Sequence, residues 1–200
     1  MVGKFGLAAV LALGTAGAAN AAVIVSEDFE SGPGAFTLTG NVGLATGASY
    51  NPCCGTPIDA SNTFVAFGGG NLPSGLASAG FNTVLGSTYT VAFDYGAISR
   101  FGGTDPLTFT VAGQNFVFSA PANNTLAFTA GSFTFIGTGG STSLVVTSGG
   151  VNNVDAIVDN ISVAGAVPEP GVWALMILGF GMVGGAIRRS KPARLAMHPA

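Results

Sequence analysis

Short stretches in which threonine or a small residue alternates with an aromatic or branched residue constrain this chain more than any other feature. The clearest case is residues 88–95, where four apolar side chains fall on one face of an extended strand: Tyr89, Val91, Phe93 and Tyr95. Residues 107–111 alternate in the same way, as do the phenylalanines at 116 and 118 and at 133 and 135. A period of two is that of a half-buried β-strand, so the pattern predicts strands at these places.

Further strands are predicted at residues 23–29, 35–39, 63–67, 144–146 and 156–163, with glycine-rich turns between the predicted strands. About ten short strands without a convincing amphipathic helix are typical of an antiparallel β-sandwich, here a jelly roll. Residues 22–166 are long enough for one hydrophobic core and too short for two. We therefore expect one all-β domain.

The first 21 residues have the three parts of a secretory signal peptide. Lys4 supplies the positive charge, residues 5–13 the apolar run, and Ala19-Asn20-Ala21 the small-residue cleavage site. We expect export with cleavage after Ala21, and an uncleaved N-terminal anchor is the alternative.

The C-terminal segment 167–189 consists of a Pro168-Glu169-Pro170 breaker, an apolar run and the basic pair Arg188 and Arg189. A helix over residues 171–187 would be roughly 25 Å long, short but adequate for a thin bilayer. The segment therefore predicts one transmembrane helix, with residues 190–200 as a cytoplasmic tail because the arginines stay on the cytoplasmic side. A permanent tail anchor is the alternative to a processed signal.

The predicted domain is strongly acidic, although only 8% of the chain is charged. Between residues 22 and 167 one arginine, Arg100, stands against eight acidic side chains, a net charge of −7. The acidic residues are Glu27, Asp28, Glu30, Asp59, Asp94, Asp105, Asp155 and Asp159. Such a domain cannot neutralise phosphates, which excludes nucleic acid as a partner.

Most catalytic chemistries lack their residues in this domain. The only histidine is His198, in the C-terminal tail, and the domain contains no lysine. Ser-His-Asp, Cys-His, Schiff-base and histidine-ligated zinc sites are therefore excluded, and no catalytic residue is predicted. A glycoside hydrolase with paired carboxylates is the remaining enzymatic alternative to a protein that is not an enzyme.

Two loops carry candidate functional residues. Cys53 and Cys54 are adjacent and are the only cysteines, so either a strained vicinal disulfide or two free or intermolecular thiols is expected in an oxidising compartment. The loop 98–106 holds Arg100 and Phe101, which are the candidate ligand-binding residues.

Asp159 occupies an unusual place in the last predicted strand. Strict alternation puts it on the same face as Ile157, Ile161 and Val163. A carboxylate on an apolar face needs hydrogen bonds or a cation to offset its desolvation. If the first and last strands are neighbours, the acidic cluster at residues 27–30 and Asp159 could share a hard cation such as Ca²⁺. The alternative is that Asp159 lies at a frayed strand start and faces water.

The ends of the domain resemble those of a known group. Residues 26–32 (SEDFESG) and 158–163 (VDNISV) are similar to the first and last strands of carbohydrate-binding-module-like, or galactose-binding-like, jelly rolls. The resemblance implies a structural calcium ion near the termini, held by Glu27 or Glu30 and by Asp159. It also implies glycan binding, although the single tryptophan, Trp173, lies outside the domain.

The segment VPEPGVWALMILGFGMVGGAIRR resembles the PEP-CTERM sorting signal of Gram-negative bacteria, with Trp173 soon after the Pro-Glu-Pro motif. The resemblance implies export, transient anchoring in the inner membrane, cleavage by an exosortase, and association with exopolysaccharide or biofilm matrix. The hypothesis is thus a secreted, non-enzymatic jelly-roll protein of the cell surface or matrix. It either binds exopolysaccharide or, as the alternative, is a purely structural, self-associating matrix protein.

Overall fold

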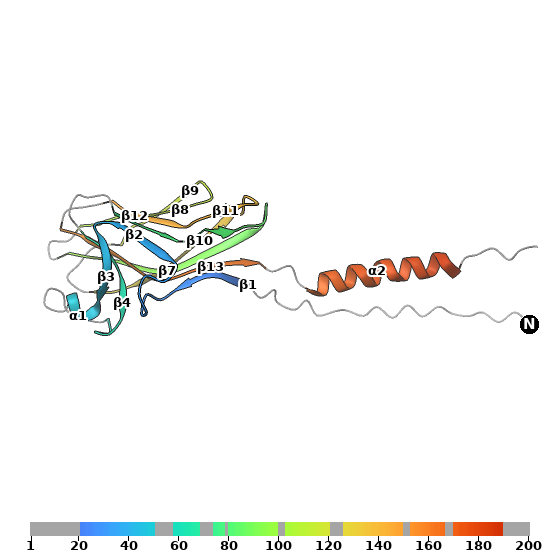
Figure 1. Ribbon diagram of the computed structural model, residues 1–200, viewed down its shortest axis with the longest axis horizontal. Coiled ribbons are helices and arrows are strands. Elements are labelled where there is room, and N and C mark those ends of the chain that lie inside the picture. The colour runs from blue at the N-terminus through green and yellow to red at the C-terminus, as the bar shows by residue number, and fades with distance from the viewer. Residues whose placement is uncertain are drawn as a thin grey trace, which may run out of the picture. The chain divides into compact units, whose positions relative to one another are not determined.

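The computed structural model describes residues 21–50, 58–68, 74–78, 80–99, 103–120, 126–149, 153–166 and 170–189 of the 200-residue chain. One compact unit, Ala21–Ala166, contains every described strand (Figure 1). The described part of the second unit is the C-terminal helix.

The domain is a sandwich of two antiparallel sheets. The first sheet has the strand order β10-β7-β13-β4-β3, with β1 also paired to β13. Its strands are β1 (Ala21–Glu27), β3 (Val42–Thr46), β4 (Thr63–Phe67), β7 (Thr88–Ile98), β10 (Thr129–Ile136) and β13 (Asp155–Ala166). The second sheet has the order β2-β5-β12-β8-β9. Its strands are β2 (Phe36–Gly40), β5 (Ser74–Ser78), β8 (Leu107–Val111), β9 (Gln114–Phe118) and β12 (Val145–Ser148).

Three short elements complete the domain. Strands β6 (Phe81–Asn82) and β11 (Ser141–Thr142) pair with each other, and α1 (Gly47–Tyr50) follows β3. All described strand pairs are antiparallel, which confirms the predicted sandwich.

Aromatic side chains fill the space between the sheets. Phe93 of β7 is stacked on Phe109 of β8, with 4.0 Å between the ring centroids, so this pair joins the two layers. Phe118 of β9 lies edge-on to both rings, and Phe133 of β10 is tilted against Phe93 and edge-on to Phe109. Burial of each aromatic ring removes apolar surface from water, which stabilises the fold. The stacked and edge-on arrangements of the rings add further stabilisation.

A β-bulge divides strand β13 into two parts, and the alternation of inward and outward side chains is reversed from one part to the other. Against β7, Asp159 pairs with Asp94 but Ser162 pairs with Ala92, so β13 contains one extra residue. Asn160, with φ of 49°, adopts the left-handed conformation at this point. Because the extra residue reverses the alternation, Val158 and Ile161 both face the main core.

The sheet that contains β13 also carries a second, smaller core on its outer face. Four buried residues form it: Phe64, Ile98, Leu126 and Ile157. Tyr50 of α1 and Ile58 pack against this cluster, so the segment around α1 covers part of the outer face. The sheet is therefore buried on both faces here, which explains why Phe64 and Val65, adjacent in β4, are both fully buried.

The two ends of the sandwich differ. At one end, the terminal end, Ala21 at the start of β1 pairs with Ala166 at the end of β13 (Figure 1). This pairing confirms that the first and last strands are neighbours. At the opposite end, the loop end, β7 finishes at Ile98 and β13 begins at Asp155, and these two residues are paired.

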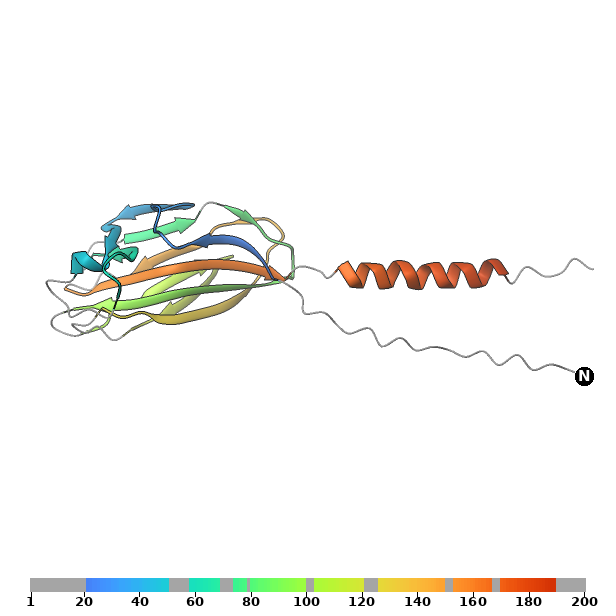
Figure 2. The ribbon, with the colours of Figure 1, turned by 90° about the horizontal axis from the view of Figure 1, so that it is seen from below.

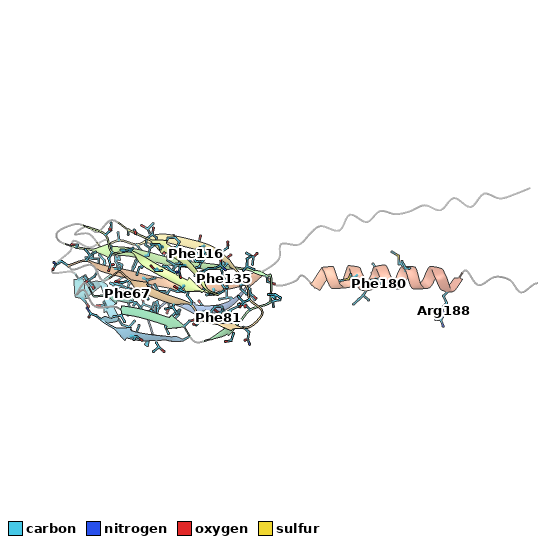
Figure 3. The ribbon with its side chains drawn as sticks, turned by 90° about the horizontal axis from the view of Figure 1, so that it is seen from above. Phe67, Phe81, Phe116, Phe135, Phe180 and Arg188 are labelled. Atoms are coloured by element: carbon cyan, nitrogen blue, oxygen red, sulfur yellow. The ribbon has the colours of Figure 1, made fainter. Side chains whose placement is uncertain are left out.

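Helix α2 (Pro170–Arg189) is the described element of the second unit. Phe180 and Arg188 project from it and are exposed (Figure 3). Among the described residues, no helix combines the length and the apolarity needed to cross a membrane. The membrane span predicted at residues 171–187 is therefore not confirmed.

Candidate functional site

The carboxylate of Asp159 lies at the centre of a buried polar network on the outer face of the first sheet. Asp159 is only 2% exposed. The side-chain amide of Asn62 donates a hydrogen bond of 2.9 Å to its Oδ2, and the backbone N–H of Asn160 donates one of 2.7 Å to its Oδ1. The alternative that Asp159 is at a frayed strand start and faces water is therefore wrong. The predicted face is also wrong, because the bulge separates Asp159 from Ile161 and Val163.

Two further carboxylates lie around this network. Asp94, the cross-strand partner of Asp159, accepts a hydrogen bond of 2.9 Å from the side-chain amide of Asn160. Glu30 accepts one of 2.9 Å from the backbone N–H of Thr63, the residue after Asn62. Desolvation by burial raises the pKa of Asp159, while its two hydrogen bonds lower it and the charges of Asp94 and Glu30 raise it further.

The raised pKa predicts how Asp159 affects stability as pH changes. Folding favours the protonated form, so its contribution is fully present below the ordinary value of 3.8 and is lost as pH rises through the folded pKa. Urea unfolding of wild type and Asp159→Asn, in metal-free buffer between about pH 4 and pH 7, measures this contribution. We expect the stability of the variant relative to wild type to increase with pH. The control Val117→Ala, at an exposed side chain that does not ionise, should show no such trend, and a pH-independent difference for Asp159→Asn would contradict the prediction.

Glu27, the alternative to Glu30 as the early calcium ligand, accepts its hydrogen bonds in a turn. Its Oε1 accepts a hydrogen bond from the backbone N–H of Phe29, and its Oε2 accepts one from that of Ala35. Glu27 thus closes the turn between β1 and β2, where a side chain at Gly34 would run into its carboxylate. In the described ranges no three acidic, histidine or cysteine side chains are grouped as a metal site requires. The structure thus brings Glu30 toward Asp159 and leaves Glu27 apart.

A second carboxylate of β13 anchors the segment around α1. The hydroxyl of Tyr50 donates a hydrogen bond of 3.0 Å to Asp155 Oδ2, and the Tyr50 ring packs against Phe64. Burial raises the pKa of Tyr50 well above its usual range, and the negative charge of Asp155 and this hydrogen bond add to the effect. Tyr50 therefore remains a neutral hydrogen-bond donor that holds the end of α1 on the sheet.

The loop end contains the flanks of the candidate ligand loop. Asp105 is buried there, and its Oδ2 accepts a hydrogen bond of 2.8 Å from the hydroxyl of Ser148. Ser99, at the other flank, is also buried. Arg100 and Phe101 themselves lie outside the described residues. The same is true of the predicted signal peptide except for its last residue, of Cys53 and Cys54, of Pro168 and Glu169, and of the tail 190–200.

Three residues that hydrogen-bond to the carboxylates of β13 were not predicted from the sequence: Asn62 and Asn160 beside Asp159, and Tyr50 beside Asp155. The sequence contains a weak indication of a bulge at Asn160, because asparagine tolerates a positive φ and an Asp-Asn pair interrupts an otherwise apolar strand. Asn62 and Tyr50 carried none, because they are 97 and 105 residues from their carboxylate partners in the chain.

The C-terminal segment of the chain matches a known protein family. Residues 166–190 match the family model of the PEP-CTERM protein-sorting motif. The chain therefore carries a PEP-CTERM sorting motif, and the matched segment includes Pro168, Glu169, Pro170, Trp173, Arg188 and Arg189. The motif indicates export and sorting to the cell envelope or surface. No curated relative matches the sequence.

Solved structures of similar fold include carbohydrate-binding modules. TmCBM61, solved with β-1,4-galactotriose, has a TM-score of 0.50 and 14% identity, with 68% of this chain and 93% of that chain covered. The CBM22-1 xylan-binding domain of Paenibacillus barcinonensis Xyn10C has a TM-score of 0.50 and 12% identity, with 76% and 100% covered. A family 35 module from Clostridium thermocellum scores 0.48 at 15% identity, with 71% and 98% covered. At these identities the likeness shows the fold alone, a jelly-roll β-sandwich.

Proposed function

We propose that this chain is a secreted, non-enzymatic glycan-binding protein that is sorted to the cell surface or extracellular matrix. One observation carries the proposal: a sandwich with the fold of carbohydrate-binding modules ends at Ala166, where the PEP-CTERM motif begins. The fold supports binding to a carbohydrate, and the motif supports delivery to the envelope, where such polymers occur.

The loop end supports a binding site better than the terminal end. The chain enters and leaves the sandwich at the terminal end, whereas β7 finishes at the loop end just before Arg100 in the sequence, the only cationic residue between residues 22 and 167. Asp105 and Ser99, at the two ends of the loop that holds Arg100, are buried, so the ends of the loop are held in place. An arginine beside an aromatic ring can donate hydrogen bonds to sugar hydroxyls while the ring packs on the sugar face.

Retention on immobilised polysaccharide tests the proposal. We expect an exopolysaccharide extracted from the producing cells to retain the wild-type protein, and Arg100→Ala with Phe101→Ala to bind at least about tenfold more weakly, a loss of about 1.4 kcal/mol. The matched control is Val84→Ala with Leu85→Ala, two exposed apolar residues in the β6–β7 connection. Equal retention of both variants would place binding elsewhere, and no retention of wild type on any host polysaccharide would remove the glycan-binding function.

Processing by an exosortase follows from the sorting motif as part of the same proposal. Cleavage near Pro168-Glu169-Pro170 would release the sandwich after its last strand, because β13 ends at Ala166. Every described strand lies before this point, so the released protein would retain the whole core.

Calcium binding by Glu30 and Asp159 stays a prediction. Both side chains belong to a group of carboxylates whose like charges oppose ionisation of Asp159. A divalent cation would relieve that repulsion, and its ligands would be the carboxylate oxygens that calcium prefers. Because these oxygens already accept hydrogen bonds from Thr63, Asn62 and Asn160, binding would require local rearrangement.

A further inference from the structure

Strand β10 is a long and regular edge of the first sheet. All eight of its residues pair with β7 without a register shift, from Thr129 opposite Tyr95 to Ile136 opposite Thr88. Among the described strands, β7 is its only hydrogen-bonded neighbour. Figure 2 shows β10 along the margin of the sheet, beside β7. Its other side therefore presents a row of backbone N–H and C=O groups without strand partners, which is a template for another strand.

The features that usually protect an edge strand are missing from β10. It contains neither proline nor a charged residue, and its register shows no bulge. The other edges are less suited to pairing: β2, β3 and β9 have five residues each, and β1 has a register shift between Val23 and Val25. The whole stretch from Pro106 to Val154, which includes both β9 and β10, has no charged residue.

Packing across the sandwich holds the β10 edge in place. Phe133 of β10 is stacked on Phe116 of β9, with 4.0 Å between the centroids and 17° between the rings. Phe135 is buried and stacked on Tyr89 of β7. Because these rings fix the inward side chains, the outward residues Ser132 and Thr134 are presented on a strand that is already extended. Little ordering entropy then opposes the addition of a strand.

We propose that β10 is an interaction surface for a second copy of this chain. The two β10 strands pair antiparallel about a two-fold axis near the middle of the strand, which joins the two first sheets into one continuous sheet. Such a contact is self-complementary, since each copy offers the same extended edge to the other.

The distribution of charge favours a second copy as the occupant. Two copies of a domain with a net charge of −7 repel each other, so they can approach only where charge is missing. The charge-free flank of β9 and β10 is such a place. The nearest acidic residue on the adjacent strand, Asp94, lies opposite Ala130 and accepts a hydrogen bond from Asn160. A basic partner would be attracted to the acidic residues of β1, β7 and β13 instead.

Sedimentation velocity of the full chain over a range of concentrations tests the proposal. Wild type is expected to form dimers, and Ser132→Lys with Thr134→Lys is expected to weaken dimerisation at least about tenfold by adding like charges at the edge. The control is Thr88→Lys with Thr90→Lys, which adds the same charge on the neighbouring strand β7, at exposed positions opposite Ile136 and Thr134. Helix α2 is present in every variant, so association through it affects all of them equally.

Two further readouts need no substitution. Amide hydrogen exchange in residues 129–136 is expected to slow as protein concentration rises, and dimerisation is expected to strengthen with salt because screening reduces the repulsion between acidic copies. Exchange that does not depend on concentration, or equal weakening by the β7 control, would overturn the two-fold pairing of β10.

Discussion

Replacing Phe93 by alanine is expected to lower the free energy of unfolding by about 3–5 kcal/mol, which is the usual cost of removing a buried phenylalanine ring. Phe93 is 3% exposed, and its ring contacts those of Phe109, Phe118 and Phe133. The substitution therefore removes several of the ring contacts between the two sheets and leaves a cavity between them. A single domain has only about 5–15 kcal/mol of stability, so a large part of the total would be lost.

Chemical denaturation of the two proteins measures this effect. The control is Val117→Ala on β9, a residue that is 63% exposed, which should change stability by no more than about 0.5 kcal/mol. Phe93→Leu keeps most of the volume and should fall between the two. If Phe93→Ala were as stable as Val117→Ala, the stacked pair with Phe109 would not be the centre of the core.

Replacing Asn160 by valine is expected to destabilise the domain by about 2–4 kcal/mol, from backbone strain and a lost hydrogen bond together. The residue has φ of 49°, which asparagine tolerates and a β-branched residue does not. Valine also removes the bond to Asp94. The strand could relieve this strain only by losing the bulge. Asp159 would then face the main core, where its carboxylate would have no hydrogen-bond partner.

Asn160→Gly separates the two effects. Glycine adopts the positive φ without strain and loses only the side-chain bond, so the expected cost is about 1 kcal/mol. Thermal or urea unfolding measures the difference in the free energy of unfolding between the two variants, and we assign this difference to backbone strain. Equal stability of the valine and glycine variants would show that the conformation at Asn160 carries no strain.

Most strands could be predicted from the sequence because their period is visible locally. Residues 63–67 were predicted with the observed bounds of β4, and the stretches at 88–95 and 107–111 correspond to β7 and β8. Strands β3 and β5 were not predicted, since VGLAT and SGLAS contain glycine and alanine where the pattern needs larger apolar residues. Tertiary pairing creates these strands: β3 pairs with β4, and β5 lies between β2 and β12.

The candidate site was less predictable, for a physical reason at each residue. Alternation assigned Asp159 to one face, and a single extra residue at Asn160 reversed the assignment. The position of Glu27 depends on a turn that brings Ala35 back to it, which no local pattern encodes. The sorting motif, in contrast, was predicted because all of its residues are contiguous and its recognition depends on sequence alone.

The central position of β13 determines how the domain would respond to a pulling force. The chain leaves the sandwich through this strand, which pairs with β7 along one side and with β4 and β1 along the other. If a polymer grips the loop end while the C-terminus is held, tension runs along β13 and loads its ladders in shear, so many hydrogen bonds must break together. Tension between the two termini would instead peel β1 from β13 one pair at a time, beginning at Ala21 and Ala166. The same domain would thus be mechanically strong in the first direction and weak in the second.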